Sequence, residues 1–146
     1  MEVNEKLLVS DKDFFSLLQK SLLAEINQST NEKFSIENIK KGFTYKKIMK
    51  NKIGQKSDVK ITICEFTSNK HYKASLENYM GITFVEYLIE PIDSNSIYVK
   101  YSENFETKSK VKDLNQKFLE FLLFKRKAKN RAIKLLHSME SYINNN

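Results

Sequence analysis

Tyrosines and glutamates recur on one side of the alternating segments of this sequence. Counting by two from Ile97 leads through Tyr101 to Glu103, and the same count in the segment that begins at Val59 reaches Glu65. A pocket needs an apolar lining and a few polar groups that orient a ligand, and tyrosines with carboxylates meet that need. The alternative is that the carboxylates lie near strand ends in water and the tyrosines are core residues with wetted hydroxyls. Three further tyrosines fall on the same side of their segments: Tyr45, Tyr72 and Tyr87.

Residue types with stronger chemistry are sparse. The single cysteine, Cys64, stands in an alternating segment and is expected to be a buried, inert thiol. With only His71 and His137 beside it, no zinc-ligand spacing is present, and we expect surface or packing roles for both histidines. The three glycines are isolated, which excludes a P-loop and a dinucleotide fingerprint. We therefore assign no catalytic residue, no metal and no cofactor.

Residues 110–143 contain no Gly or Pro, and their apolar residues recur at helical spacing, which predicts one long helix. Phe118 lies on the apolar stripe and Lys125 falls in its middle, so both are candidates to face the cavity. Either the helix bends near Phe124, or Lys125 snorkels or reaches inward. The full stripe comprises Val111, Leu114, Phe118, Phe121, Ala128, Ala132, Leu135, Met139 and Ile143.

A second set of helix residues predicts an interaction surface. Leu119 and Leu123 lie roughly 120° or more from the centre of the stripe, beside several basic residues. Such a face suits a second subunit or an anionic membrane surface. The basic residues are Arg126, Lys127, Arg131 and Lys134.

Positive charge is concentrated in two segments. The net charge is +7 overall, +7 over residues 40–60 (eight Lys against one Asp) and +6 over residues 110–146 (nine Lys and Arg against three acids). Such placement fits an anionic partner, although charge runs also serve solubility. Nucleic-acid binding is disfavoured because neither an RNA-recognition motif nor a helix-turn-helix pattern is evident.

The elements that must position these residues follow a simple order. A strand at residues 2–9 precedes a helix capped by Ser10, and Ser35 to Lys40 predicts a second, short helix. About five strands with short connections follow and then the long helix. The sequence therefore predicts an α+β fold in which a curved antiparallel sheet of about six strands, in the order β-α-α-β5-α, grips the C-terminal helix.

The 146 residues predict one domain over residues 1–143 with a polar tail at residues 144–146. The polar opening residues do not fit a signal peptide, and no apolar run is long enough for a transmembrane helix. We therefore expect a cytoplasmic protein.

Several stretches resemble known proteins. The element order, with Ser10-Asp11-Lys12-Asp13-Phe14-Phe15 after the first strand, resembles the helix-grip superfamily of START-like and birch-allergen-like domains. Three segments are similar to a small bacterial family of unknown function, whose members are often encoded beside sugar phosphotransferase genes. The segments are Gly42-Phe43-Thr44-Tyr45-Lys46-Lys47, Tyr87-Leu88-Ile89-Glu90-Pro91-Ile92-Asp93 and Phe121-Leu122-Leu123-Phe124-Lys125-Arg126-Lys127. The resemblance implies a fold that commonly holds an apolar or amphipathic ligand between sheet and terminal helix.

Three functions stay open at this point. The first is a non-catalytic module that binds a small apolar or amphipathic ligand. The second is an interaction protein that docks an acidic partner or a membrane surface through its basic helix and the Lys40 to Lys60 segment, or that forms a homo-oligomer. The third, least favoured because the few His and Cys residues look structural, is a cavity enzyme of the cyclase or hydrolase type.

Overall fold

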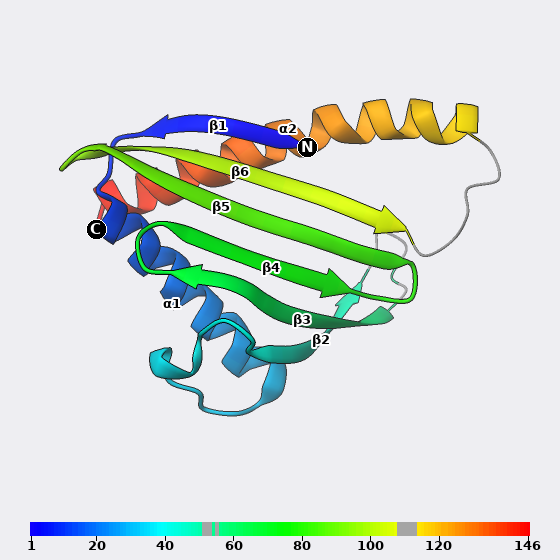
Figure 1. Cartoon of the computed structure of the whole chain (residues 1–146), viewed down its shortest axis with the longest axis horizontal. Helices are drawn as coiled ribbons and strands as arrows, with labels where there is room; N and C mark the ends of the chain where they lie inside the picture. The colour runs from blue at the N-terminus through cyan, green and yellow to red at the C-terminus, as the bar shows by residue number, and fades with distance from the viewer. Residues whose placement is uncertain (51–53, 55, 108–113) are drawn as a thin grey trace.

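The protein is an α+β structure built on one six-stranded antiparallel sheet (Figure 1). The computed structural model describes residues 1–50, 54, 56–107 and 114–146, except for the side chains of residues 114–126. The strands lie in the order β1-β6-β5-β4-β3-β2, so the first two strands of the chain form the two edges. This arrangement confirms the predicted fold class. The elements are β1 (Glu2–Leu7), α1 (Asp11–Thr30), the 3-10 turn η1 (Ile36–Asn38), β2 (Thr44–Lys50), β3 (Lys56–Thr67), β4 (His71–Glu77), β5 (Gly81–Asp93), β6 (Ser96–Thr107) and α2 (Leu114–Asn144).

Helix α1 begins as the sequence predicts. The Ser10 hydroxyl accepts a hydrogen bond of 3.1 Å from the backbone N–H of Asp13, and Asp11 and Asp13 occupy the positive end of the helix. The helix ends at Thr30, where Asn31 takes a left-handed conformation. Its buried face comprises Phe14, Phe15, Leu18, Leu22 and Ile26.

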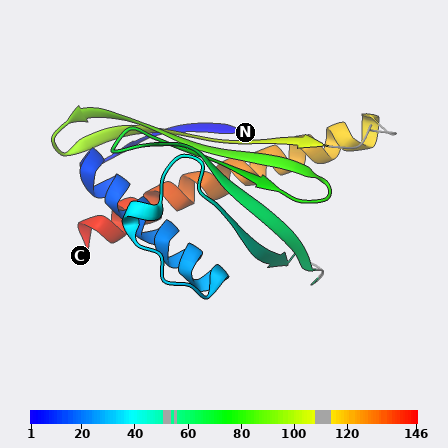
Figure 2. The same cartoon turned by 60° about the horizontal axis from the view of Figure 1, so that its bottom comes forward.

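Both helices lie on the same side of the sheet (Figure 2). Helix α1 contacts β2 and β5, whereas the described part of α2 contacts β1 and α1. The sheet therefore holds α1 as well as the predicted C-terminal helix, because α1 packs against β2 and β5. Among the described residues, no helix lies on the opposite, convex face (Figure 2). The half-buried side chains of Ile82 and Phe84 on the long strand β5 alternate with Tyr87 and so point to that face.

The buried residues of α2 differ in part from the predicted stripe. Ala132 is 3% exposed, and the side chain buried next along the helix is Leu136 at 0%. Leu135, which the stripe included, is 42% exposed. Met139 and Ile143 are half-buried against the core, as the spacing indicated. The predicted stripe residues Phe118 and Phe121 lie outside the described side chains.

Two local departures alter which residues face inward. The predicted helix from Ser35 to Lys40 is only the single turn η1. Ile36 in this turn is 39% exposed, and Ile39, which directly follows the turn, is buried. The register of β3 against β4 shifts between Ile63 and Glu65. Because the period of a strand is two, this bulge turns Glu65 onto the convex face and returns Phe66 to the concave one.

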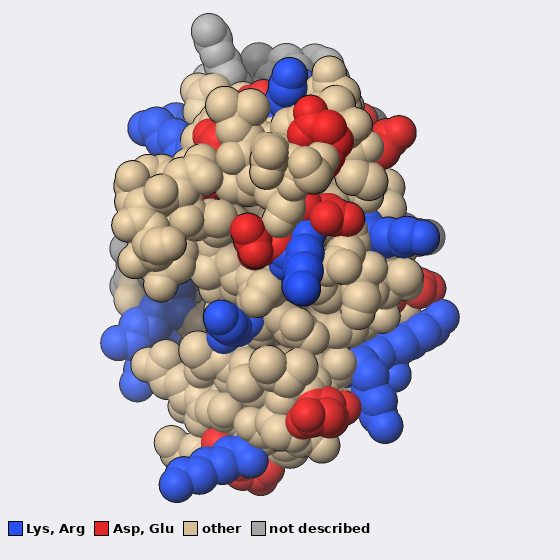
Figure 3. All heavy atoms as spheres, turned by 90° about the vertical axis from the view of Figure 1, so that its left-hand side faces the viewer, with Lys and Arg blue, Asp and Glu red and all other residues tan. Residues whose placement is uncertain are grey.

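Acidic and basic side chains are intermingled at the end of the molecule where the chain turns between β5 and β6 (Figure 3). This end therefore presents no patch of a single sign. Among the described residues, no helix combines the length and the apolar character that crossing a bilayer requires.

Candidate ligand pocket

A row of aromatic rings crosses the concave face of the sheet. Tyr72, Tyr87 and Tyr101 are direct cross-strand neighbours on β4, β5 and β6. Their ring centroids lie 6.0 Å and 4.8 Å apart, and Phe66 on β3 extends the row at 6.2 Å from Tyr72. The row exists because residues directly opposite in an antiparallel ladder point to the same face. Three of the tyrosines that the alternation singled out are thereby brought together.

A pocket of about 290 Å³ lies between this face and α1. Its floor is apolar, with Ile61, Ala74 and Val85 from the sheet and Leu18 and Leu22 from the helix. This volume lies just below the usual range for small-molecule sites, roughly 300–1,000 Å³. The polar groups at its wall are Ser21, Glu25, Tyr45, Lys47, Tyr72 and Tyr87.

One side of the pocket is organised around Glu25 of α1. Its carboxylate accepts a hydrogen bond of 2.5 Å from the Tyr45 hydroxyl and forms an ion pair with Lys47. Sequence reasoning missed Glu25 and Lys47. The signal for Glu25 was present, because it stands seven residues after Leu18 and three after Leu22, on the buried stripe of α1.

A similar group lies on β6, beside α2. The Tyr101 hydroxyl donates a hydrogen bond of 2.5 Å to Glu103, and the guanidinium of Arg131 lies 3.9 Å from the other carboxylate oxygen. Arg131 was predicted to belong to an outward interaction surface, and its side chain is 70% exposed. The structure thus joins one residue of that predicted surface to two residues of the predicted cavity.

The tyrosines differ in what their hydroxyls contact. Within the described part of the chain, no protein group bonds to the hydroxyls of Tyr72 and Tyr87, and no fully buried side-chain polar atom lacks a partner. These two hydroxyls therefore open onto the pocket. Burial raises the pKa of both phenols, and the charge of Glu25 adds to the rise at Tyr72 as that of Glu103 does at Tyr87. Both are protonated hydrogen-bond donors at neutral pH.

Other predicted residues lie elsewhere. Glu65 is on the convex face, where its ion pair with Lys41 at 3.0 Å lowers its pKa. The side chains of Phe118 and Lys125, predicted for the cavity, lie outside the described residues, as do Leu119, Leu123 and Arg126 of the predicted surface. The two remaining members of that surface, Lys127 and Lys134, are exposed.

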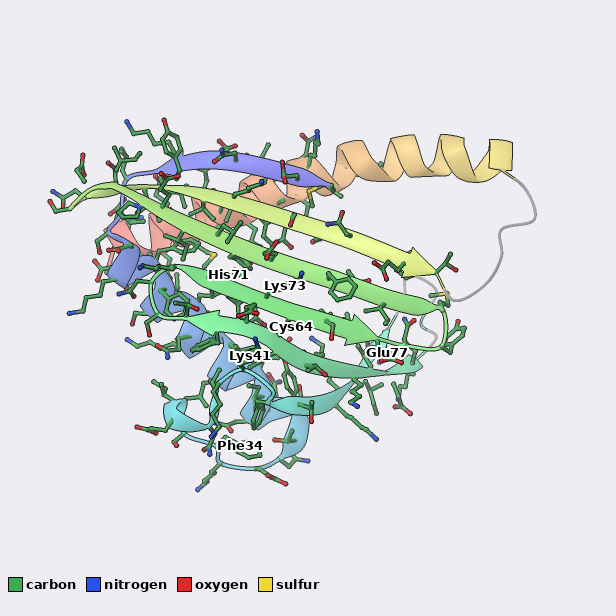
Figure 4. All side chains as sticks on the ribbon, in the orientation of Figure 1. Phe34, Lys41, Cys64, His71, Lys73 and Glu77 are labelled. Carbon is green, nitrogen blue, oxygen red and sulfur yellow. The ribbon has the colours of Figure 1, made fainter. Side chains whose placement is uncertain are left out.

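The convex face carries the other chemically active side chains (Figure 4). His71 lies 2.6 Å from Glu86, and the Lys73 amine lies 5.4 Å from the centroid of the Phe84 ring. Cys64 is half-buried and donates to the Thr62 carbonyl at 3.6 Å. No group of His, Cys, Asp and Glu suited to a metal ion occurs among the described residues.

A family model matches residues 1–124 of this sequence. The chain belongs to the domain family of unknown function DUF3284. A search of curated proteins finds no match.

Solved structures show that this DUF3284 chain has the helix-grip fold predicted from its element order. The structure of Ara h 8.0201 superposes with a TM-score of 0.65 at 14% identity, over 100% of this chain and 97% of that one. A START superfamily protein from Mycobacterium smegmatis gives 0.60 at 12% identity, over 99% and 97% of the two chains. A conserved protein from Geobacillus kaustophilus gives 0.60 at 20% identity, over 99% and 94%. These identities are low, so the likeness establishes the fold alone.

Proposed function

We propose that this protein is a non-catalytic binding module for a small, uncharged and largely apolar molecule that carries a hydrogen-bond acceptor. The observation that carries the proposal is a pair of tyrosine hydroxyls, those of Tyr72 and Tyr87, that open onto an apolar pocket and have no partner among the described residues. A ligand carbonyl, ether or hydroxyl oxygen placed between them would accept from both.

The charges around the pocket favour a neutral ligand. Glu25 is matched by Lys47, and Glu103 lies beside Arg131, so each carboxylate already has a cation nearby. An anionic ligand would meet the Glu25 carboxylate at the pocket wall, and a cationic ligand would compete with Lys47 for it. A neutral molecule leaves both arrangements intact.

The size of the pocket limits the ligand to a compact molecule of one or two rings. A volume of about 290 Å³ is too small for a long acyl chain in the described part of the cavity. The ring faces of Tyr72 and Tyr87 add contacts that suit an aromatic or alicyclic ligand.

The test is a thermal-shift screen with neutral cyclic ketones, phenols and lactones, followed by calorimetry on any molecule that raises the melting temperature. Replacing both Tyr72 and Tyr87 by Phe should weaken binding about tenfold or more, because two hydrogen bonds of roughly 1 kcal/mol each are lost. Leu76→Trp should fill the pocket and abolish binding, whereas Leu88→Trp, on the convex face, should leave it unchanged.

The proposal fails if no neutral cyclic compound stabilises the protein while carboxylates or amines do. It also fails if a bound ligand is unaffected by both Leu76→Trp and the double tyrosine variant. An enzymatic role would instead show as turnover of a compound that binds.

A further inference from the structure

The two edges of the sheet are not equivalent. Strand β1 lies against α2, whose Glu140 carboxylate and Asn144 amide bond to the backbone of Leu8 at the end of this edge. Strand β2 pairs only with β3 in the described part of the chain, so its other side is open. The end of one edge strand is therefore fastened to a helix, whereas the other edge strand keeps an unpaired side in the described part of the chain.

The backbone groups at the open edge can be assigned. The Phe43 carbonyl accepts from the Ile63 N–H at 2.9 Å, and the register continues without a shift to Lys50 opposite Lys56. In an antiparallel ladder, alternate residues point their N–H and C=O groups toward the partner strand and the rest point them away. Thr44, Lys46, Ile48 and Lys50 therefore direct their backbone groups outward from the sheet.

The side chains of the same residues define what this edge accepts. Lys46, Ile48 and Lys50 alternate along the convex face, and Ile48 is 65% exposed. Neither lysine forms an ion pair with a described residue. Lys46 lies opposite Lys60, and Lys50 lies opposite Lys56, so like charges meet in direct register.

The charges that offset this lysine cluster are few. Asp58 lies opposite Ile48, and Glu77 on β4 lies opposite Lys60. Both acids are on interior strands, away from the outer side of β2. Along the convex face, a newly added strand would thus meet Lys46, Ile48 and Lys50 in turn, which are a basic, an apolar and a basic side chain.

We propose that β2 is a docking site for an extended acidic segment of another protein, which adds to the sheet as a further strand. The backbone of β2 supplies the main-chain hydrogen bonds, as in other cases of strand addition. Acidic side chains at every fourth position of the segment meet Lys46 and Lys50, and an apolar side chain between them covers Ile48. A second copy of this chain is a poor occupant, because its own β2 would bring lysines against lysines.

A flat anionic membrane fits this strand less well. Ile48 and Met49 are both exposed, at 65% and 40%, yet successive residues of a strand project to opposite faces. A single planar surface cannot cover both, whereas an added strand lies along the edge between them.

The experiment uses a short capped peptide in which Glu, Val and Glu occupy every second position and Thr occupies the positions between them, as in Glu-Thr-Val-Thr-Glu. Its sequence reads the same in both directions, so it tests parallel and antiparallel addition together. Titrated into the whole isotope-labelled protein at low salt, it should shift the amide resonances of Thr44, Lys46, Ile48 and Lys50 more than any others. The matched peptide with Lys in place of Glu should not bind.

Two variants separate charge from backbone pairing. The double change Lys46→Glu and Lys50→Glu should weaken binding of the acidic peptide at least tenfold and create binding of the Lys peptide. Lys12→Glu with Lys20→Glu, on the exposed side of α1, alters the net charge equally and should change nothing. Ile48→Pro removes an outward N–H without disturbing the bonds to β3 and should also weaken the acidic peptide.

The proposal is overturned if the acidic peptide does not bind at low salt, or if its shifts fall outside β2. It is also overturned if anionic vesicles or RNA engage Lys46 and Lys50 while the peptide does not. Amide spectra of each variant, recorded first, show that the fold is retained.

Discussion

The Glu140 carboxylate of α2 accepts a hydrogen bond of 2.6 Å from the backbone N–H of Leu8, at the end of β1. His137 lies 3.0 Å from the same carboxyl group and 3.9 Å from Glu5 of β1. The Asn144 amide donates to the Leu8 carbonyl at 3.2 Å. These contacts fasten the last third of α2 to the first strand of the chain.

We expect Glu140→Gln to destabilise the protein by about 1–2 kcal/mol at pH 7, since a charge-assisted hydrogen bond is weakened. Burial alone would raise the pKa of Glu140, but the hydrogen bonds from His137 and Leu8 outweigh it and lower the pKa. A lowered pKa stabilises the fold above the unfolded value near 4.5, and this contribution is lost as pH falls through the folded value. Urea unfolding at pH 7 and pH 3 measures the difference, which should shrink at pH 3. A difference that is equal at both pH values would contradict this account.

Leu136 and Leu135 offer a comparison between adjacent residues. Leu136 is fully buried and Leu135 is 42% exposed. Leu136→Ala should therefore reduce the free energy of unfolding by about 2–5 kcal/mol, because a cavity is left in the core. Leu135→Ala should change it by less than about 0.5 kcal/mol. Chemical denaturation of the two variants decides which leucine faces the core, and equal effects would contradict the burial of Leu136 against the sheet.

The buried tyrosines predict a steep loss of stability in alkali. Burial, as the largest cause, raises the pKa of Tyr45, Tyr72, Tyr87 and Tyr101 above the ordinary value of 10.0. The folded state therefore keeps these protons while the unfolded state releases them, so the stability they confer is complete below pH 10 and declines above it. Phenolate absorbance followed during alkaline unfolding should show their ionisation coinciding with loss of structure.

Phe variants refine that test. Replacing Tyr72 and Tyr87 by Phe should make the alkaline transition less steep and change stability at pH 7 by less than about 1 kcal/mol, since neither hydroxyl bonds to a described protein group. Tyr101→Phe should cost about 1–3 kcal/mol, because it removes the hydrogen bond to Glu103. If all three hydroxyls prove equally important at pH 7, the open position of the Tyr72 and Tyr87 hydroxyls is contradicted.

The lysines of β2 also protect an open edge against self-pairing. Changing Lys46 and Lys50 together to Val should raise the tendency of the protein to associate, because two such edges then pair without repulsion. Sedimentation velocity over a concentration series measures this. Lys60→Val, on the neighbouring interior strand, is the control and should leave association unchanged. Association that is the same in both variants would indicate a contact outside β2.

The sequence was most informative about which strand residues share one face of the sheet. Alternation placed Tyr72, Tyr87 and Tyr101 on one face, and the structure has them there because their strands pair without irregularity between them. The same counting failed at Glu65, since the register shift after Ile63 inserts one residue and reverses the faces beyond it. A bulge leaves no mark that alternation alone can detect.

Helical spacing has a different limit. Leu135 and Leu136 are about 100° apart on the helix, on either side of the centre of the apolar stripe, and spacing does not say which of them meets a neighbour. That choice depends on where α1 and β1 lie, which only the folded chain determines. Glu25 was missed for a related reason: a carboxylate on a buried stripe is explained only by its partners Tyr45 and Lys47, which lie 20 and 22 residues away.

The bonding of α2 to the end of β1 has a consequence for folding. Glu140 and Asn144 hold the backbone of Leu8, which stands 132 and 136 residues before them. Because loop-closure entropy opposes contacts of such sequence separation, this corner of the sheet is completed only after most of the chain has been placed.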